Sequence, residues 1–244
     1  QYLPPKISLE GNGIKRGLTA VEAALLLEQP LDKILSMILF GLVKKGGAKV
    51  ATKDPLKIEA LPQPQYELFE YEKDFLAAMT NANKAETRKG LQAMMVGLVK
   101  SVSEKMRGFS RKETIAYYQE IMKRAWDQMT AAGSPEVQMK AFDEAMEWTM
   151  LDRKYEDRSR EVFGPRPVFV PLWWGRYDPG FGRGASTVST PSLPTQVGSA
   201  PGSVSLPSLP GADFAASVSS GIQNFSSKVV GDITNFTSGV TNST

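Results

Sequence analysis

The side chains that could do chemistry in this 244-residue chain are carboxylates, Lys, Ser, Thr and Tyr, because it contains no His and no Cys. That composition excludes Ser-His-Asp and Cys-His nucleophiles, zinc sites with Cys or His ligands, haem ligation by His, and disulfides. Carboxylates one helical turn apart, Glu144 with Glu147 and Asp152 with Glu156, could hold a metal ion or transfer a proton. Such pairs are common on exposed helices, and no His completes a bundle-type metal site. We therefore expect a non-enzymatic protein with no metal and no cofactor.

Nucleotide and nucleic-acid binding are also poorly matched by the sequence. The glycines of residues 180–184 are followed by a Ser- and Pro-rich segment rather than a helix, which excludes a nucleotide-binding loop. The chain has 29 Lys and Arg against 26 Asp and Glu, and no segment is basic enough for a general nucleic-acid surface. We therefore do not expect nucleic acid to be the main partner.

Residues 164–183 form an aromatic strap that mixes Trp173, Trp174 and Tyr177 with four Pro and three Arg. Pro at this density excludes a regular helix. The rings could lie at a membrane interface, stack on single-stranded nucleic acid, or be buried across the helical bundle predicted for residues 62–163. We favour burial, with the membrane interface as the next alternative.

The last segment of the chain, residues 212–244, repeats every 11 residues. A period of 3.67 residues per turn keeps its bulky apolar side chains on one stripe of a helix, whose other face is Ser, Thr, Asn and Gly. The stripe consists of Phe214, Val218, Ile222, Phe225, Val229, Ile233, Phe236 and Val240. These residues and the three strap rings are predicted to bind a membrane or a partner. Residues 184–211, rich in Ser, Pro and Gly, are predicted to be a flexible linker.

The predicted tail helix needs an apolar host, because its Gly, Ser, Thr and Asn residues are poor helix formers. The host could be a bilayer interface; since Lys228 is the only base in the segment, binding would then depend on exposed hydrocarbon. It could also be partner helices in a larger assembly, including a homo-oligomer that joins like stripes in a right-handed coil. A chance periodicity in an unstructured tail is the third alternative.

Residues 1–61 are predicted to form a winged-helix-like module. Thr19-Ala-Val-Glu22 is a capping box that begins a helix, and Pro30 separates it from a second helix over residues 32–45. Gly46-Gly47 is suited to the left-handed helix end, and two short alternating runs around Asp54-Pro55 predict a hairpin.

Within this module, Tyr2-Leu-Pro-Pro5, the run Leu18 to Leu27, the run Leu39 to Gly46 and the hairpin resemble a segment of YciQ-like predicted bacterial membrane proteins. In that family the segment follows a membrane helix, and no activity is established. The resemblance implies that an extracytoplasmic domain and a membrane helix precede Gln1, and the absence of a signal-peptide pattern also leads us to expect a longer product. This sequence departs from the family in having no further apolar span after the module.

A winged helix also raises the alternative of a DNA-binding regulator. The helix that would enter the major groove contains the apolar run Ile34 to Val43, which offers no Arg, Asn or Gln to read a base edge. Five lysines around it could touch phosphates, which positions a protein without specifying a sequence: Lys44, Lys45, Lys49, Lys53 and Lys57.

Residues 62–163 are predicted to be an antiparallel helical bundle that follows a stiff Pro-containing linker. Apolar residues at 3-4 spacing and further capping residues predict helices over about 67–79, 85–106, 110–133 and 135–162. The fold class is therefore mainly α.

Together, these features predict a membrane-associated interaction or assembly protein, the soluble part of a larger anchored protein at the cytoplasmic face of a membrane. A winged-helix DNA-binding regulator is the alternative.

Overall fold

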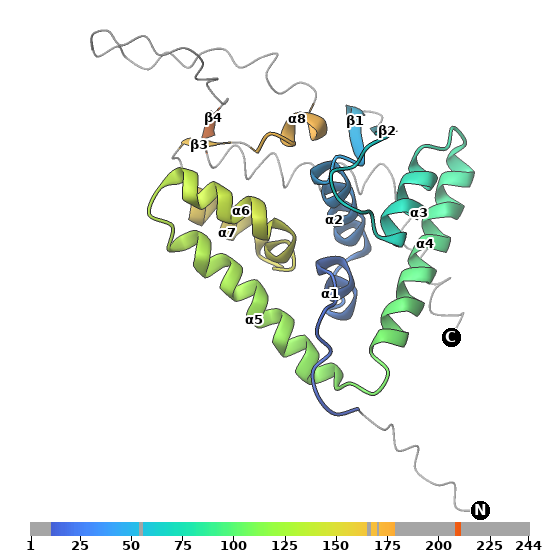
Figure 1. The fold of residues 1–244 in the computed structure, drawn as a ribbon, viewed down its shortest axis with the longest axis horizontal. Helices are drawn as coiled ribbons and strands as arrows, with labels where there is room; N and C mark the ends of the chain where they lie inside the picture. Colours follow the sequence, from blue (N-terminus) through green and yellow to red (C-terminus); the bar gives the residue numbers. More distant parts are fainter. Residues whose placement is uncertain (1–10, 54–55, 165–166, 170, 179–207, 211–244) are drawn as a thin grey trace, which may run out of the picture.

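The computed structural model describes residues 11–53, 56–164, 167–169, 171–178 and 208–210 (Figure 1). Within these ranges it contains eight helices and two small two-stranded sheets, which confirms the mainly helical fold class. None of the described helices is long and apolar enough to cross a bilayer. The predicted tail helix lies outside the described residues, as does nearly all of the predicted linker.

The first described elements are α1 (Ala20–Leu26), α2 (Leu31–Lys44), β1 (Ala48–Lys53) and β2 (Leu56–Ala60). The capping box of α1 is formed as predicted, since the Thr19 side chain accepts from the Glu22 backbone N–H and the Glu22 carboxylate from the Thr19 N–H. After α2, Gly46 adopts the left-handed conformation with φ of 74°. The two strands pair antiparallel, with a register shift between Val50 and Thr52.

The next four helices form two hairpins (Figure 1). Helix α3 (Glu70–Met79) pairs with α4 (Lys84–Lys105), and α5 (Arg111–Thr130) pairs with α6 (Pro135–Thr149). Helices α4 and α5 meet at a short turn and then diverge, so that the two hairpins form the arms of a V.

Helices α1 and α2 lie between the arms of the V (Figure 1). Helix α1 contacts α4, α5 and α6, while α2 contacts α3 and the β1 strand. Ten consecutive residues of α2, Ile34 to Val43, are buried. The apolar residues of α1 and α2 and those of the two hairpins therefore belong to one hydrophobic core.

The prediction of one helix over residues 135–162 is wrong, because α7 (Tyr155–Phe163) is separate from α6. Between them, Asp152 Oδ1 accepts a hydrogen bond of 2.8 Å from the Lys154 backbone N–H. A local side-chain acceptor of this kind competes with helical hydrogen bonding and favours a turn. Helix α7 then folds back on α6, where the Phe142 and Phe163 rings meet edge to face at 5.1 Å.

The strap is largely irregular, with a short strand β3 (Pro167–Phe169) and one turn of helix, α8 (Trp174–Tyr177). Strand β3 lies on α6 and pairs antiparallel with β4 (Ser208–Pro210), which is the last described element. The end of the predicted linker is thus a strand that pairs with β3, and the predicted tail, residues 212–244, follows this strand after one further residue.

Candidate functional site

The three strap rings predicted to bind a membrane or a partner are buried in this structure. Trp173, Trp174 and Tyr177 are 5%, 1% and 4% exposed, and their ring centroids lie 6.3, 6.1 and 4.7 Å from that of Phe40 on α2. We call these four residues the aromatic clasp. The rings are buried, as the favoured alternative predicts, but they pack on α2, outside the predicted bundle, as well as beside α6. A role in binding lipid or a partner would require the strap to leave this position. That binding role stays a prediction.

Polar contacts hold the aromatic clasp to the end of α2. Arg176 Nε donates to the Val43 carbonyl at 3.0 Å, and its Nη2 donates to the Lys44 carbonyl at 3.2 Å. The last carbonyls of a helix have no partner within the helix and carry its negative dipole end. The Arg176 guanidinium therefore caps α2 with both hydrogen bonds and charge.

The clasp is also fixed to α6 and to the β-hairpin. Trp173 Nε1 donates to the Asp143 carboxylate at 2.6 Å, and Lys53 on β1 forms an ion pair of 2.6 Å with Asp178. The strap thus joins α2 and β1 to α6, which lies far from both of them in the sequence.

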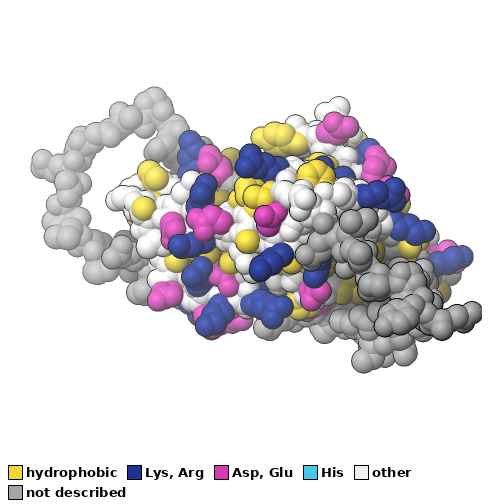
Figure 2. Space-filling view, turned by 90° about the horizontal axis from the view of Figure 1, so that it is seen from below, with side chains coloured by type: hydrophobic (Ala, Val, Ile, Leu, Met, Phe, Trp, Pro, Cys, Tyr) yellow, Lys and Arg dark blue, Asp and Glu magenta, His cyan; other side chains and the backbone are white. Residues whose placement is uncertain are grey.

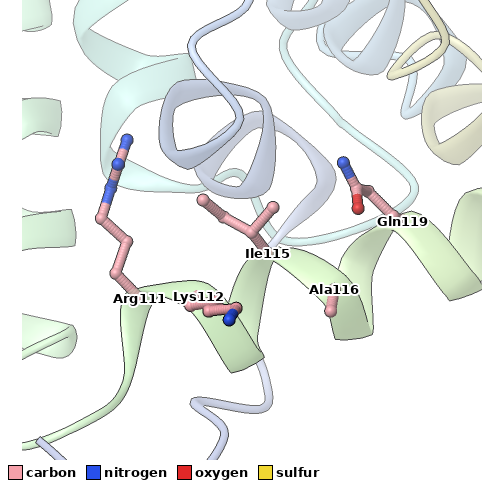
Figure 3. A pocket seen from close by; sticks show the side chains of 5 residues that line it. All are labelled: Arg111, Lys112, Ile115, Ala116 and Gln119. Atoms are coloured by element: carbon pink, nitrogen blue, oxygen red, sulfur yellow. The ribbon is translucent and has the colours of Figure 1, made fainter.

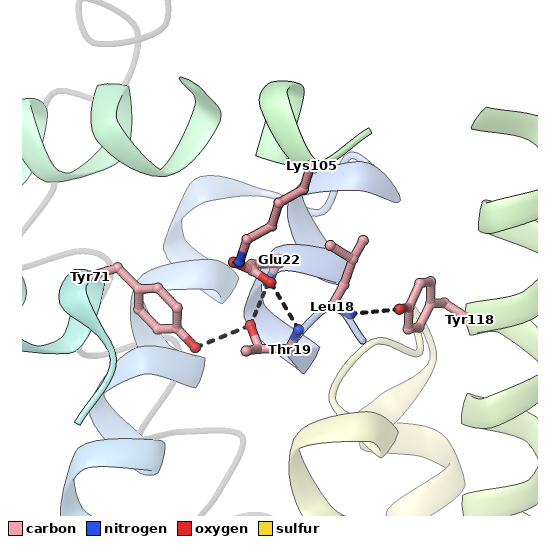
Figure 4. A network of polar contacts seen from close by, with 6 residues as sticks. All are labelled: Leu18, Thr19, Glu22, Tyr71, Lys105 and Tyr118. Atoms are coloured by element: carbon pink, nitrogen blue, oxygen red, sulfur yellow. Dashed lines mark hydrogen bonds and ion pairs between the residues drawn. The ribbon is translucent and has the colours of Figure 1, made fainter. Parts of the chain in front are cut away.

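A second polar network surrounds the start of α1 (Figure 4). Tyr71 of α3 donates its hydroxyl to Thr19 Oγ1 at 3.1 Å, and Lys105 of α4 forms an ion pair with Glu22, which is only 3% exposed. Burial raises the pKa of the Tyr71 hydroxyl, so it stays protonated and can donate. One helix start is therefore tied to both helices of the first arm.

Residues 13–18, which we call the N-terminal lace, run along the first turns of α5. The Leu18 backbone N–H donates to the Tyr118 hydroxyl at 2.8 Å (Figure 4). That hydroxyl donates to the Lys15 carbonyl at 3.2 Å. The Lys15 N–H donates to Thr114 Oγ1 at 3.0 Å. Burial raises the pKa of Tyr118, which keeps the bridging hydroxyl neutral. The lace attaches the start of α1 to the second arm.

Two carboxylates from different arms approach α2 at Gly41. A methyl group on Gly41 would lie 3.1 Å from Glu72 Oε1 of α3 and 3.2 Å from Glu147 Oε1 of α6. Glu72 forms an ion pair of 2.7 Å with Lys45. Burial raises the pKa of Glu147, and the charges of Lys44 and Lys45 oppose this shift in part.

The one-turn carboxylate pairs weighed from the sequence, and not expected to form a site, are not the ones that the structure brings together. Glu144 is exposed, whereas Glu147 faces Glu72 from another element. Asp152 pairs with Arg158 at 3.1 Å rather than with Glu156. Among the described residues, no group of three or more carboxylates could hold a metal ion. One sequence signal could have indicated that Glu72 and Glu147 approach α2. This signal is Gly41, a glycine within a helix whose other residues are mostly bulky and apolar.

Helix α5 carries an open pocket of about 430 Å³ near its N-terminus (Figure 3). Its lining side chains follow two adjacent rows of the helix: Arg111, Lys112, Ile115, Ala116 and Gln119. Positions four apart lie on the same helix face, so the pocket combines two basic side chains with the apolar Ile115 and Ala116.

Comparisons with known proteins identified no relative of this chain. The chain matched no protein-family model, no curated protein and no solved structure. The resemblance of residues 1–60 to YciQ-like proteins therefore stays a prediction. So do the tail stripe residues, which lie outside the described residues: Phe214, Val218, Ile222, Phe225, Val229, Ile233, Phe236 and Val240.

The N-terminal lace predicts a large difference between two adjacent tyrosines. Tyr118→Phe removes the hydroxyl that bridges Leu18 and Lys15 and leaves the buried Leu18 N–H without its partner, which costs about 1–3 kcal/mol. Tyr117→Phe keeps the ring under Arg16 and should change the free energy of unfolding by less than about 0.5 kcal/mol. Urea denaturation measures both variants, and equal losses would contradict the assigned role of the lace.

The carboxylate at Gly41 predicts a pH dependence of stability. Burial raises the folded-state pKa of Glu147 above its ordinary value of 4.5. The protonated Glu147 side chain therefore contributes its full stabilisation below pH 4.5, and this stabilisation is lost as the pH rises through the raised pKa. Glu147→Gln should therefore be more stable than the parent at neutral pH and lose less stability as the pH rises from 4.5.

The matched control is Glu144→Gln, which changes the same charge on an exposed position one turn away. Urea denaturation from pH 4 to 8 should leave its pH profile parallel to that of the parent. A Glu147→Gln profile that also stays parallel would show that Glu147 ionises freely in the folded protein.

Proposed function

We propose that this chain is a non-enzymatic, membrane-associated interaction or assembly protein, the extramembrane part of a larger anchored protein at the cytoplasmic face. The observation that carries the proposal is the 11-residue repeat of the tail, in which the pattern of Gly221 to Lys228 recurs in Asp232 to Gly239. A helix of residues 214–240 would be about 40 Å long, with one continuous apolar stripe.

The free energies favour a tail helix that forms only on an apolar host. Burying the seven bulky residues from Val218 to Val240 stabilises the helix by roughly 10–20 kcal/mol, at about 1.5–3 kcal/mol for each side chain. Ordering the 27 residues from Phe214 to Val240 costs a similar or larger amount, at about 1–2 kcal/mol each. Three glycines in the segment add about 1 kcal/mol each to that cost. Folding and attachment are therefore one event.

The body supports this proposal by giving the tail a fixed origin. Strand β4, which ends at Pro210, pairs with β3, and β3 lies on α6. The tail therefore follows closely after a strand that is packed on the helices. A membrane or assembly that binds the stripe would also hold the helical part of the chain close to it.

In this proposal the winged-helix-like module is the centre of the body rather than a reader of DNA. Residues Ile34 to Val43 of α2, which would face the major groove in the alternative, are all buried. Four of the five lysines that could contact phosphate already form ion pairs: Lys44, Lys45, Lys49 and Lys53. We therefore do not propose the DNA-binding regulator as a second function.

Flotation of the full chain with small phosphatidylcholine vesicles tests the proposal. Such highly curved, uncharged vesicles expose hydrocarbon, which is what a stripe with one base requires. Phe225→Ser combined with Phe236→Ser removes one ring from each repeat. The partition coefficient of the protein into the vesicles should then fall on the order of a hundredfold. Circular dichroism should show a gain of helix on vesicles for the parent but not for this double Phe variant.

The matched control is Asn224→Ser combined with Asn235→Ser, which changes the adjacent residue in each repeat and leaves the stripe intact. It should bind like the parent. If the parent neither floats nor gains helix, or if both double variants behave alike, the membrane proposal fails.

A further inference from the structure

Two segments that are far apart in the sequence cross at the base of the V. A methyl group on Gly11 would lie only 2.0 Å from the backbone carbonyl carbon of Gly108, so the two backbones are in direct contact. Residues 11–17 and 105–112 together carry six basic and no acidic side chains: Lys15, Arg16, Lys105, Arg107, Arg111 and Lys112. We call these two segments the basic end.

Several of these bases remain available to a ligand. Lys105 and Arg111 form ion pairs with Glu22 and Glu28. The other exposed bases, Arg16, Arg107 and Lys112, form no ion pair with any residue in the described part of the chain.

Acidic residues border the basic end without neutralising it. Glu104 and Glu113 flank the segment that carries four of the bases, and Glu113 accepts a hydrogen bond of 3.0 Å from the Gly13 N–H. Figure 2 views the molecule from this end and shows Lys and Arg side chains spread over the face with acidic side chains among them.

The basic end also has apolar surface beside its charges. Lys15 lies over the half-buried Phe109 ring with 5.2 Å between its Nζ and the ring centroid. The α5 pocket places Arg111 and Lys112 next to Ile115 (Figure 3). A site for a free anion needs only the charges, whereas a phospholipid headgroup presents a phosphate with its glycerol esters and acyl chains below it.

We propose that the basic end binds the anionic headgroups of a phospholipid bilayer, with phosphate at Lys112, which forms no ion pair in the described part of the chain, and glycerol ester against Ile115. This inference rests on the proposed membrane association and adds a second contact to it. The tail stripe uses hydrocarbon and carries little charge, while the basic end uses charge and is attracted to the negative surface of a membrane leaflet.

The test measures binding of the full chain to large vesicles of phosphatidylcholine with and without phosphatidylglycerol. Large vesicles have few packing defects, so the tail contributes less than it does on small ones. The parent should bind only the anionic vesicles, and its affinity should fall as salt is raised. Combining Arg16→Gln, Arg107→Gln and Lys112→Gln should weaken binding on the order of a hundredfold, at about fivefold for each base.

The matched control removes three exposed bases from the other end of α4, through Lys84→Gln, Arg88→Gln and Lys89→Gln. It makes the same change in net charge about 30 Å away and should bind like the parent. Equal losses in the two triple variants would mean that only net charge matters and would overturn the site. Unchanged binding by the first triple variant would do the same.

Two further experiments distinguish this proposal from binding by the tail and from a site for a free anion. Phe225→Ser with Phe236→Ser should retain salt-sensitive binding to anionic vesicles even though it no longer floats with small neutral ones, so the two membrane contacts can fail independently. Inorganic phosphate, added at constant ionic strength, should not release the parent from anionic vesicles. Release would identify a free-anion site and overturn the assignment to a bilayer.

Discussion

The structure depends on the burial of α2, a helix with ten consecutive buried residues and therefore no face that can meet water. A helix that is apolar on all sides must be enclosed by other elements. Helices α1, α3 and α8 and strand β1 contact it, and Glu147 of α6 reaches it at Gly41. Its one buried hydroxyl, on Ser36, donates to the Asp32 carbonyl at 2.8 Å, so no polar group is left without a partner there. The two arms of the V are thus held by a shared apolar centre.

Charged and polar contacts then fix how each arm meets that centre. Arg176 satisfies the final carbonyls of α2, and the ion pair of Lys45 with the buried Glu72 holds α3 beside it. At the start of α1, Glu22 and Tyr118 connect this helix to opposite arms through an ion pair and a bridging hydroxyl. Breaking any of these contacts would leave a buried charge or polar group without its partner, so each of them disfavours other positions of the arms.

Local signals in the sequence predicted the elements, but not their assembly. The capping box at Thr19, the left-handed Gly46 and the hairpin are set by residues close together in the chain, and each is confirmed. The helix break near Asp152 was missed because the apolar spacing continues across it, and Gly41 was not recognised as a point of close approach. The basic end was also missed, because counting charge by segment divides its two halves between different parts of the chain.

If α2 is the enclosed centre of one cooperative body, amide hydrogen exchange of the full chain should show it. Enclosure predicts that the amides from Ile34 to Val43 exchange only through global unfolding, with the same free energy as the buried turns of α4 and α5. If the α2 amides exchange at a lower free energy, or if one arm of the V loses protection while the other keeps it, α2 is not the enclosed centre of a cooperative unit.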